Sequence, residues 1–262
     1  MLVKLMKYEF MAMGRRFLPL FAALLIVSVI NRILLGLDMS VPSGIGVAVS
    51  VILMVGIIVL ILILTIQRFW SNFLSSEGYL MMTLPVCTDR LILSKLFVAS
   101  IWYVVGANVV ALSILIMAVV GVSFTDIIEF IRNAWAMIPF SPPQLALLSV
   151  ELLVVTVLGL FGNILILYAC LSLSMFSNKH RWLLAFGAYV GITTAIQIIV
   201  SIVISIGVAT AMFTWIGDYI NGLSLFTQMQ FFVVFIFAIE LLSCAAFYFI
   251  TRYMLKNRLN LQ

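Results

Sequence analysis

Residues 44–66, GIGVAVSVILMVGIIVLILILTI, form a run without a charged side chain. A second uncharged run, Leu96–Phe124, lies beyond a polar interval. Each run is at least as long as the roughly 20 apolar residues that a helix needs to cross a bilayer, whereas barrel strands are about 10 residues long and alternate in polarity. The runs therefore predict membrane-spanning helices, which satisfy their backbone hydrogen bonds internally.

The composition of the whole chain agrees with this interpretation. Hydrophobic residues make up 65% of the 262 residues and charged residues 9%. A soluble domain carries roughly 25% charged residues, so this chain could not cover a surface that faces water. We therefore expect an all-α integral membrane protein. The net charge of +5 does not indicate a nucleic-acid partner, because the basic residues lie at the ends of apolar runs.

The chain is predicted to begin with an interfacial amphipathic helix over residues 1–16, followed by a transmembrane domain of six helices over residues 17–262. In the first segment, Met6, Phe10, Met13 and Phe17 recur at helical spacing on one face. The alternative is that this segment is only the basic flank of the first span. Pro19 is expected in the first turn of that span, where proline is tolerated. The predicted spans are Phe17–Leu37, Ile45–Ile66, Leu96–Val120, Leu145–Phe176, Trp182–Phe213 and Met229–Thr251.

Basic residues are distributed asymmetrically over the connections between these spans. Loops rich in lysine and arginine stay in the cytoplasm. Both termini and the loop 67–95 are therefore predicted to be cytoplasmic, and the loops 121–144 and 214–228 to lie outside. Of the 14 basic residues, only Arg32 and Arg132 fall on the outer side. The inner side holds Lys4, Lys7, Arg15, Arg16, Arg68, Arg90, Lys95, Lys179, Arg181, Arg252, Lys256 and Arg258.

The sequence offers little for catalysis. Its one histidine, His180, lies in a short basic loop and is interpreted as a solvated residue. The three cysteines form no disulfide framework, and no cluster of His, Cys, Asp and Glu has metal-ligand spacing. Neither a Walker A sequence nor G-x-S-x-G is present. The chain is therefore expected not to be an enzyme by itself and to hold no metal.

Polar residues inside the predicted spans are the candidates for function, since charges at the centre of a membrane helix are costly. Glu240 lies near the middle of the last span, either as a substrate-path or proton-linked carboxylate or as a buried residue bonded to a neighbouring helix. Arg32 and Glu151 lie at similar depths, and we hypothesise an ion pair between them. Asn108, Asn163 and Gln197 are expected to join helices. The glycine pairs Gly187/Gly191 and Gly159/Gly162 indicate faces that contact other helices, a dimer seam among the alternatives.

The polar interval between the second and third spans carries the most specific motif. It reads Phe73-x-x-x-Glu77-Gly78-Tyr79-Leu80-x-x-Thr83-Leu84-Pro85 and is followed by Ser94-Lys95. This motif, together with six spans and both ends inside, resembles the permease subunit of bacterial type-2 ATP-binding-cassette exporters. The motif covers about 25 residues, and the resemblance in topology covers the whole chain.

The resemblance implies that the interval couples the membrane part to a separate cytoplasmic ATPase. The coupling helix would run from Glu77 to Leu84 and end near Pro85, because the residue before a proline is driven out of helical geometry. The implied coupling residues are Glu77, Gly78, Tyr79, Leu80, Met82, Thr83, Leu84 and Pro85. At the edges of the loop, Arg68, Arg90 and Lys95 are interpreted as orientation anchors.

Further expectations follow from the same resemblance. The permease would work with a second copy or a paralogue, surrounded by lipid in the bacterial cytoplasmic membrane. ATP and magnesium would bind to the partner ATPase, so no cofactor is expected in this chain. Exported substrates of such permeases include drugs, antimicrobial peptides and lipid-like molecules.

Two other classes of function stay open. A proton-coupled secondary transporter or channel would depend on Glu240. A membrane enzyme would need polar groups that converge near one interface, and the sequence shows almost none.

Overall fold

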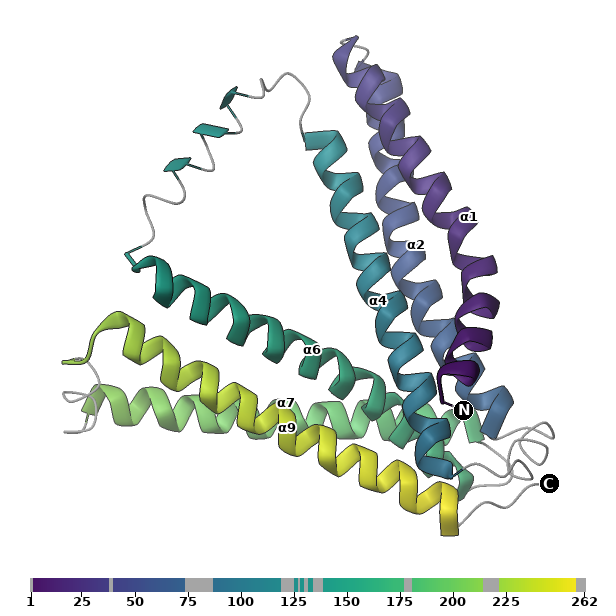
Figure 1. Ribbon diagram of the computed structural model, residues 1–262, viewed down its shortest axis with the longest axis vertical. Helices are drawn as coiled ribbons and strands as arrows, with labels where there is room; N and C mark the ends of the chain where they lie inside the picture. Colours follow the sequence, from purple (N-terminus) through teal and green to yellow (C-terminus); the bar gives the residue numbers. More distant parts are fainter. Residues whose placement is uncertain are drawn as a thin grey trace. The chain divides into compact units, whose positions relative to one another are not determined.

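The computed structural model describes residues 2–37, 40–73, 87–118, 125–126, 128–129, 132–133, 139–176, 181–213 and 222–257 (Figure 1). Within these ranges the regular structure is helical, with no strand, and six helices are long and apolar enough to cross a membrane. The prediction of an all-α, multi-pass membrane protein is confirmed to this extent. The orientation of the termini stays a prediction.

The chain divides into two compact units, which are described separately. The first unit holds α1 (Leu2–Gly36), α2 (Ser40–Phe73) as far as Ser71, and α4 (Thr88–Ala118). The second unit holds α6 (Pro142–Leu173), the short 3₁₀ helix η1 (Ser174–Phe176), α7 (Arg181–Phe213) and α9 (Leu225–Asn257).

In the first unit, α1, α2 and α4 run side by side around an aromatic core (Figure 1). Phe10, Phe17 and Phe21 of α1 surround the indole of Trp102, with ring centroids 4.8, 5.1 and 6.1 Å from it. Gly14 of α1 leaves room for this ring, because a Cβ at this position would lie 3.1 Å from the indole. Lipid is as apolar as these side chains, so close packing rather than escape from water holds such helices together. From α2, the core receives Ile57, Ile61 and Leu64.

One helix replaces the predicted interfacial segment and first span. α1 runs without interruption from Leu2 to Gly36, so Pro19 lies inside the helix and not in its first turn as predicted. The proline removes the amide that would bond the carbonyl four residues earlier. The helix nevertheless continues, because Met13 and Phe17 before the proline and Phe21 after it pack into the same core. The apolar face of residues 1–16 thus contacts other helices, and its placement at a membrane interface stays a prediction.

In the second unit, α6 packs against both α7 and α9. Its second half is buried over a continuous stretch, residues 164–172. The helix begins at Pro142, where the backbone N–H of Ser141 donates to the side-chain oxygen of Gln144 at 3.0 Å. This bond satisfies a backbone donor at the helix start, which explains why α6 begins slightly before the predicted Leu145.

The contact between α6 and α9 is polar as well as apolar. At the end of this contact that is predicted to lie near the outer side of the membrane, the Gln230 amide donates to a Glu151 carboxylate oxygen at 2.8 Å. Further along, the Cys244 thiol donates to the Leu158 carbonyl at 3.4 Å. Just beyond Leu158, Gly159 and Gly162 face Glu240 and Cys244 of α9, which confirms that this glycine pair marks a contact face. By contrast, nothing in the described part of the chain lies within 4 Å of the space that side chains at Gly187 and Gly191 would occupy.

Candidate functional site

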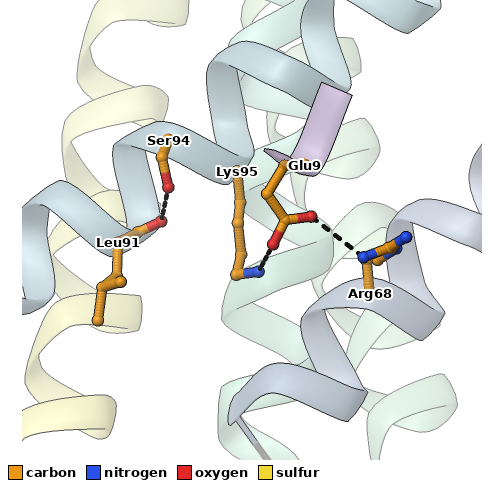
Figure 2. Close-up of polar contacts among 5 residues, drawn as sticks. All are labelled: Glu9, Arg68, Leu91, Ser94 and Lys95. Atoms are coloured by element: carbon orange, nitrogen blue, oxygen red, sulfur yellow. Dashed lines mark hydrogen bonds and ion pairs between the residues drawn. The ribbon is translucent and has the colours of Figure 1, made fainter. Parts of the chain in front are cut away.

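Two arrangements in the structure bear on function, one in each unit. The first is a cluster of three charged residues, Glu9, Arg68 and Lys95, which we call the Glu9 cluster. Lys95 Nζ donates to Glu9 Oε1 at 2.7 Å, and Arg68 Nη1 donates to Glu9 Oε2 at 3.4 Å (Figure 2). Each carboxylate oxygen of Glu9 therefore serves a different cation on a different helix.

The Glu9 cluster lies at the base of the predicted coupling loop. Arg68 lies near the end of α2 and Lys95 near the start of α4, so the two cations flank the predicted coupling loop. Glu9 comes from α1. One carboxylate thus ties together the helix that enters the loop, the helix that leaves it, and the N-terminal helix.

Burial makes the Lys95 ammonium group dependent on this pairing. The Lys95 side chain is 6% exposed and that of Glu9 is 13% exposed, whereas Arg68 is 27% exposed. A buried ammonium group requires a nearby anion and hydrogen-bond acceptors to offset the loss of water. Ser94, which Figure 2 also shows, donates to the Leu91 carbonyl of its own helix at 2.8 Å and so adds nothing to the cluster.

The sequence predicts Arg68 and Lys95 as orientation anchors, but it does not identify Glu9 as their common partner. A signal was present, because Glu9 is the only acidic residue in the otherwise basic residues 1–37. A single carboxylate in the basic flank of a membrane helix indicates an ion pair with a lysine or arginine. The predicted coupling residues Glu77–Pro85 and the lone histidine His180 lie outside the described residues.

The second arrangement is a cavity of about 820 Å³ in the second unit, between α6, α7 and α9. We call it the Glu240 cavity. Its wall is mainly isoleucine, valine and phenylalanine. The polar residues that line it are Asn163, Tyr189, Thr193, Gln197, Glu240 and Ser243.

Space for the Glu240 carboxylate depends on a glycine. A Cβ at Gly162 would lie 3.1 Å from Glu240 Oε2, closer than most Cβ contacts in proteins, so the carboxylate would have to shift by a few tenths of an ångström. Three polar neighbours direct their bonds elsewhere: the Asn163 amide, the Thr193 hydroxyl and the Ser243 hydroxyl each donate to a backbone carbonyl of their own helix, at 2.8, 2.7 and 2.9 Å. Across the described ranges, no hydrogen-bond donor contacts the Glu240 carboxylate.

The cavity gathers three of the residues that the sequence predicted separately, Asn163, Gln197 and Glu240. Their spacing along each helix gave no indication that they share one space. Two other candidates behave differently. Asn108 is exposed and donates to the Val104 carbonyl of its own helix at 2.8 Å. Glu151 lies outside the cavity and accepts the Gln230 amide at 2.8 Å.

The hypothesised pair of Arg32 and Glu151 would join the two units. Arg32 is exposed within the first unit, and Glu151 already has an amide donor within the second. The pair stays a prediction.

Over the parts of the chain that the structure covers, no three His, Cys, Asp or Glu side chains are grouped so that they could hold a metal ion. Comparisons with protein-family models, with curated proteins and with solved structures gave no match. Function is therefore inferred from the motif, the charge distribution and the two arrangements described above.

Proposed function

We propose that this chain is the membrane-spanning permease subunit of an ATP-binding-cassette exporter in the bacterial cytoplasmic membrane. It would act with a separate cytoplasmic ATPase and a second permease subunit. The observation that carries the proposal is the Glu9 cluster. It ties α1 to the two helices that flank the coupling motif at residues 77–85, the segment whose resemblance to exporter permeases is most specific.

In this mechanism the ATPase supplies the energy, and this chain transmits the resulting movement to its membrane helices. Binding and hydrolysis of ATP with magnesium on the partner would move the loop between α2 and α4. Glu9 would then carry the displacement to α1, so that the first unit responds as one body. The partner can drive this change only if it binds the two states of the permease with different affinities.

Assembly with the ATPase tests the proposal. The chain is co-expressed with the Walker A protein encoded beside its gene and purified by a tag on the permease. We expect Glu77→Lys and Leu80→Asp to lose the ATPase, because they reverse a charge and bury a carboxylate at the docking segment. Asp126→Lys, a charge reversal in the predicted outer loop, should keep it. Full recovery of the ATPase with both loop variants would contradict the proposal.

A second candidate function is proton-coupled transport through Glu240. It is favoured by the absence, within the described ranges, of a donor to this carboxylate in a largely apolar cavity. Transport that continues after ATP depletion, follows an imposed proton gradient and stops in Glu240→Gln would favour this candidate over the first.

A further inference from the structure

We propose that the Glu240 cavity binds a hydrophobic organic cation, with the Glu240 carboxylate as its counter-ion. As an assignment of the exported substrate class, this inference rests on the proposed function. As a binding site, it stands on the geometry of the second unit alone.

The size and wall of the cavity fit a small organic molecule. Binding sites for such ligands are typically about 300–1,000 Å³, mostly apolar, with a few polar groups that fix orientation. The Glu240 cavity has a volume of about 820 Å³ and an aliphatic and aromatic wall interrupted by six polar residues. A purely polar ligand would leave most of this wall without a matching surface.

The charge of the site selects a cation. Among the described residues that line the cavity, Glu240 is the only aspartate, glutamate, lysine, arginine or histidine. A carboxylate in apolar surroundings is unfavourable unless an opposite charge or hydrogen bonds offset its desolvation. No described donor does so. A cation bound against Glu240 would supply the missing partner.

The composition of the wall distinguishes an organic cation from a metal ion. Calcium requires six to eight oxygen ligands, whereas this site offers one carboxylate. Aromatic rings from Tyr189, Phe235 and Phe247 line the same cavity. The faces of such rings attract ammonium and related cations within about 6 Å. A cation with an apolar body would thus use both the carboxylate and the wall.

Equilibrium dialysis of radiolabelled tetraphenylphosphonium against the purified full chain in an uncharged detergent tests this site without any ATPase. We expect saturable binding that weakens at least about tenfold in Glu240→Gln, a change that keeps the shape and removes the charge. The matched control is Glu151→Gln, which neutralises the other carboxylate of α6 and α9 outside the cavity and should leave binding unchanged. Tetraphenylsilane, which has the same shape and no charge, should not compete.

A second variant keeps the test decisive if Glu240→Gln fails to fold. Ile199→Trp adds bulk at an exposed position of the cavity wall without touching the carboxylate and should also weaken binding. Equal affinity for tetraphenylphosphonium in the wild type, Glu240→Gln and Ile199→Trp would overturn the proposal. Competition by tetraphenylsilane as effective as that by unlabelled tetraphenylphosphonium would overturn it too.

The natural cation could be a free compound or the ammonium headgroup of a lipid. Phosphatidylethanolamine added to the micelles distinguishes the two, since displacement of the probe identifies the headgroup and retention identifies a free cation. Failure of binding is also separable from failure of the proposed function. If the chain forms the ATPase complex but does not bind the probe, only the proposed binding site is overturned. Glu77→Lys, which should lose the ATPase, should leave probe binding unchanged.

Discussion

The two units place a glutamate in opposite circumstances. In the first unit, Glu9 contacts two cations on two neighbouring helices at 2.7 and 3.4 Å. In the second, Glu240 faces a cavity of about 820 Å³, and no donor within the described residues contacts its carboxylate. The first unit also fills its centre with the ring of Trp102, whereas the second leaves a hollow. The first unit is thus joined by ion pairs and a packed aromatic core, whereas the second has a largely apolar cavity with one carboxylate.

The largest expected difference between the units concerns their aromatic residues. Trp102→Ala removes a 3% exposed ring that contacts three phenylalanines, so the free energy of unfolding should fall by about 3–5 kcal/mol. Phe235→Ala should have a much smaller effect, because this ring is 45% exposed and lines the cavity. Titration with a denaturing detergent measures both. Equal losses would remove the contrast between a packed and a hollow unit.

The second largest difference in the free energy of unfolding is expected between variants of Glu9 and of Glu240. Glu9→Ala should lower the free energy of unfolding by about 1.5–3 kcal/mol, since buried Lys95 loses a charge-assisted bond. Adding Lys95→Met to Glu9→Ala should recover part of this loss. In contrast, Glu240→Ala should have little effect or stabilise the protein. A loss in Glu240→Ala as large as that in Glu9→Ala would show that Glu240 has a structural partner after all.

A smaller difference is expected within the Glu9 cluster. Arg68→Ala should cost less than about 1 kcal/mol, because this ion pair is longer and its arginine is 27% exposed. Raising the salt concentration should weaken the Arg68 contribution more than that of Lys95, which is buried from the solvent. Stability curves of the two single variants at low and high salt would detect the difference. The same salt dependence for both would indicate that the burial of Lys95 has no energetic consequence.

Much of the fold could be predicted from the sequence because a membrane imposes a simple rule. Runs such as residues 44–66 must be helical in lipid, and their ends are marked by charges. The behaviour of α1 could not be predicted in the same way. Pro19 suggested a helix start, but the core residues on both sides of it stabilise one continuous helix, and that contact depends on Trp102 far along the chain.

The candidate sites were predictable only in part. Spacing along a helix shows which residues share a face, but it does not show which other helix that face meets. Glu240 stood out by its cost inside a span, whereas its cavity arises from three helices, and Gly162 is needed to make room for it. Likewise, Glu9 finds Arg68 and Lys95 at positions 59 and 86 residues away.

The central claim is that the loop between α2 and α4 couples this chain to a partner ATPase. The most direct test measures ATP hydrolysis by that ATPase in proteoliposomes, alone, with the wild-type chain and with the Leu80→Asp variant. We expect the wild-type chain to change the rate of hydrolysis and Leu80→Asp to return that rate to the value of the ATPase alone. The same rate in all three preparations would contradict the account.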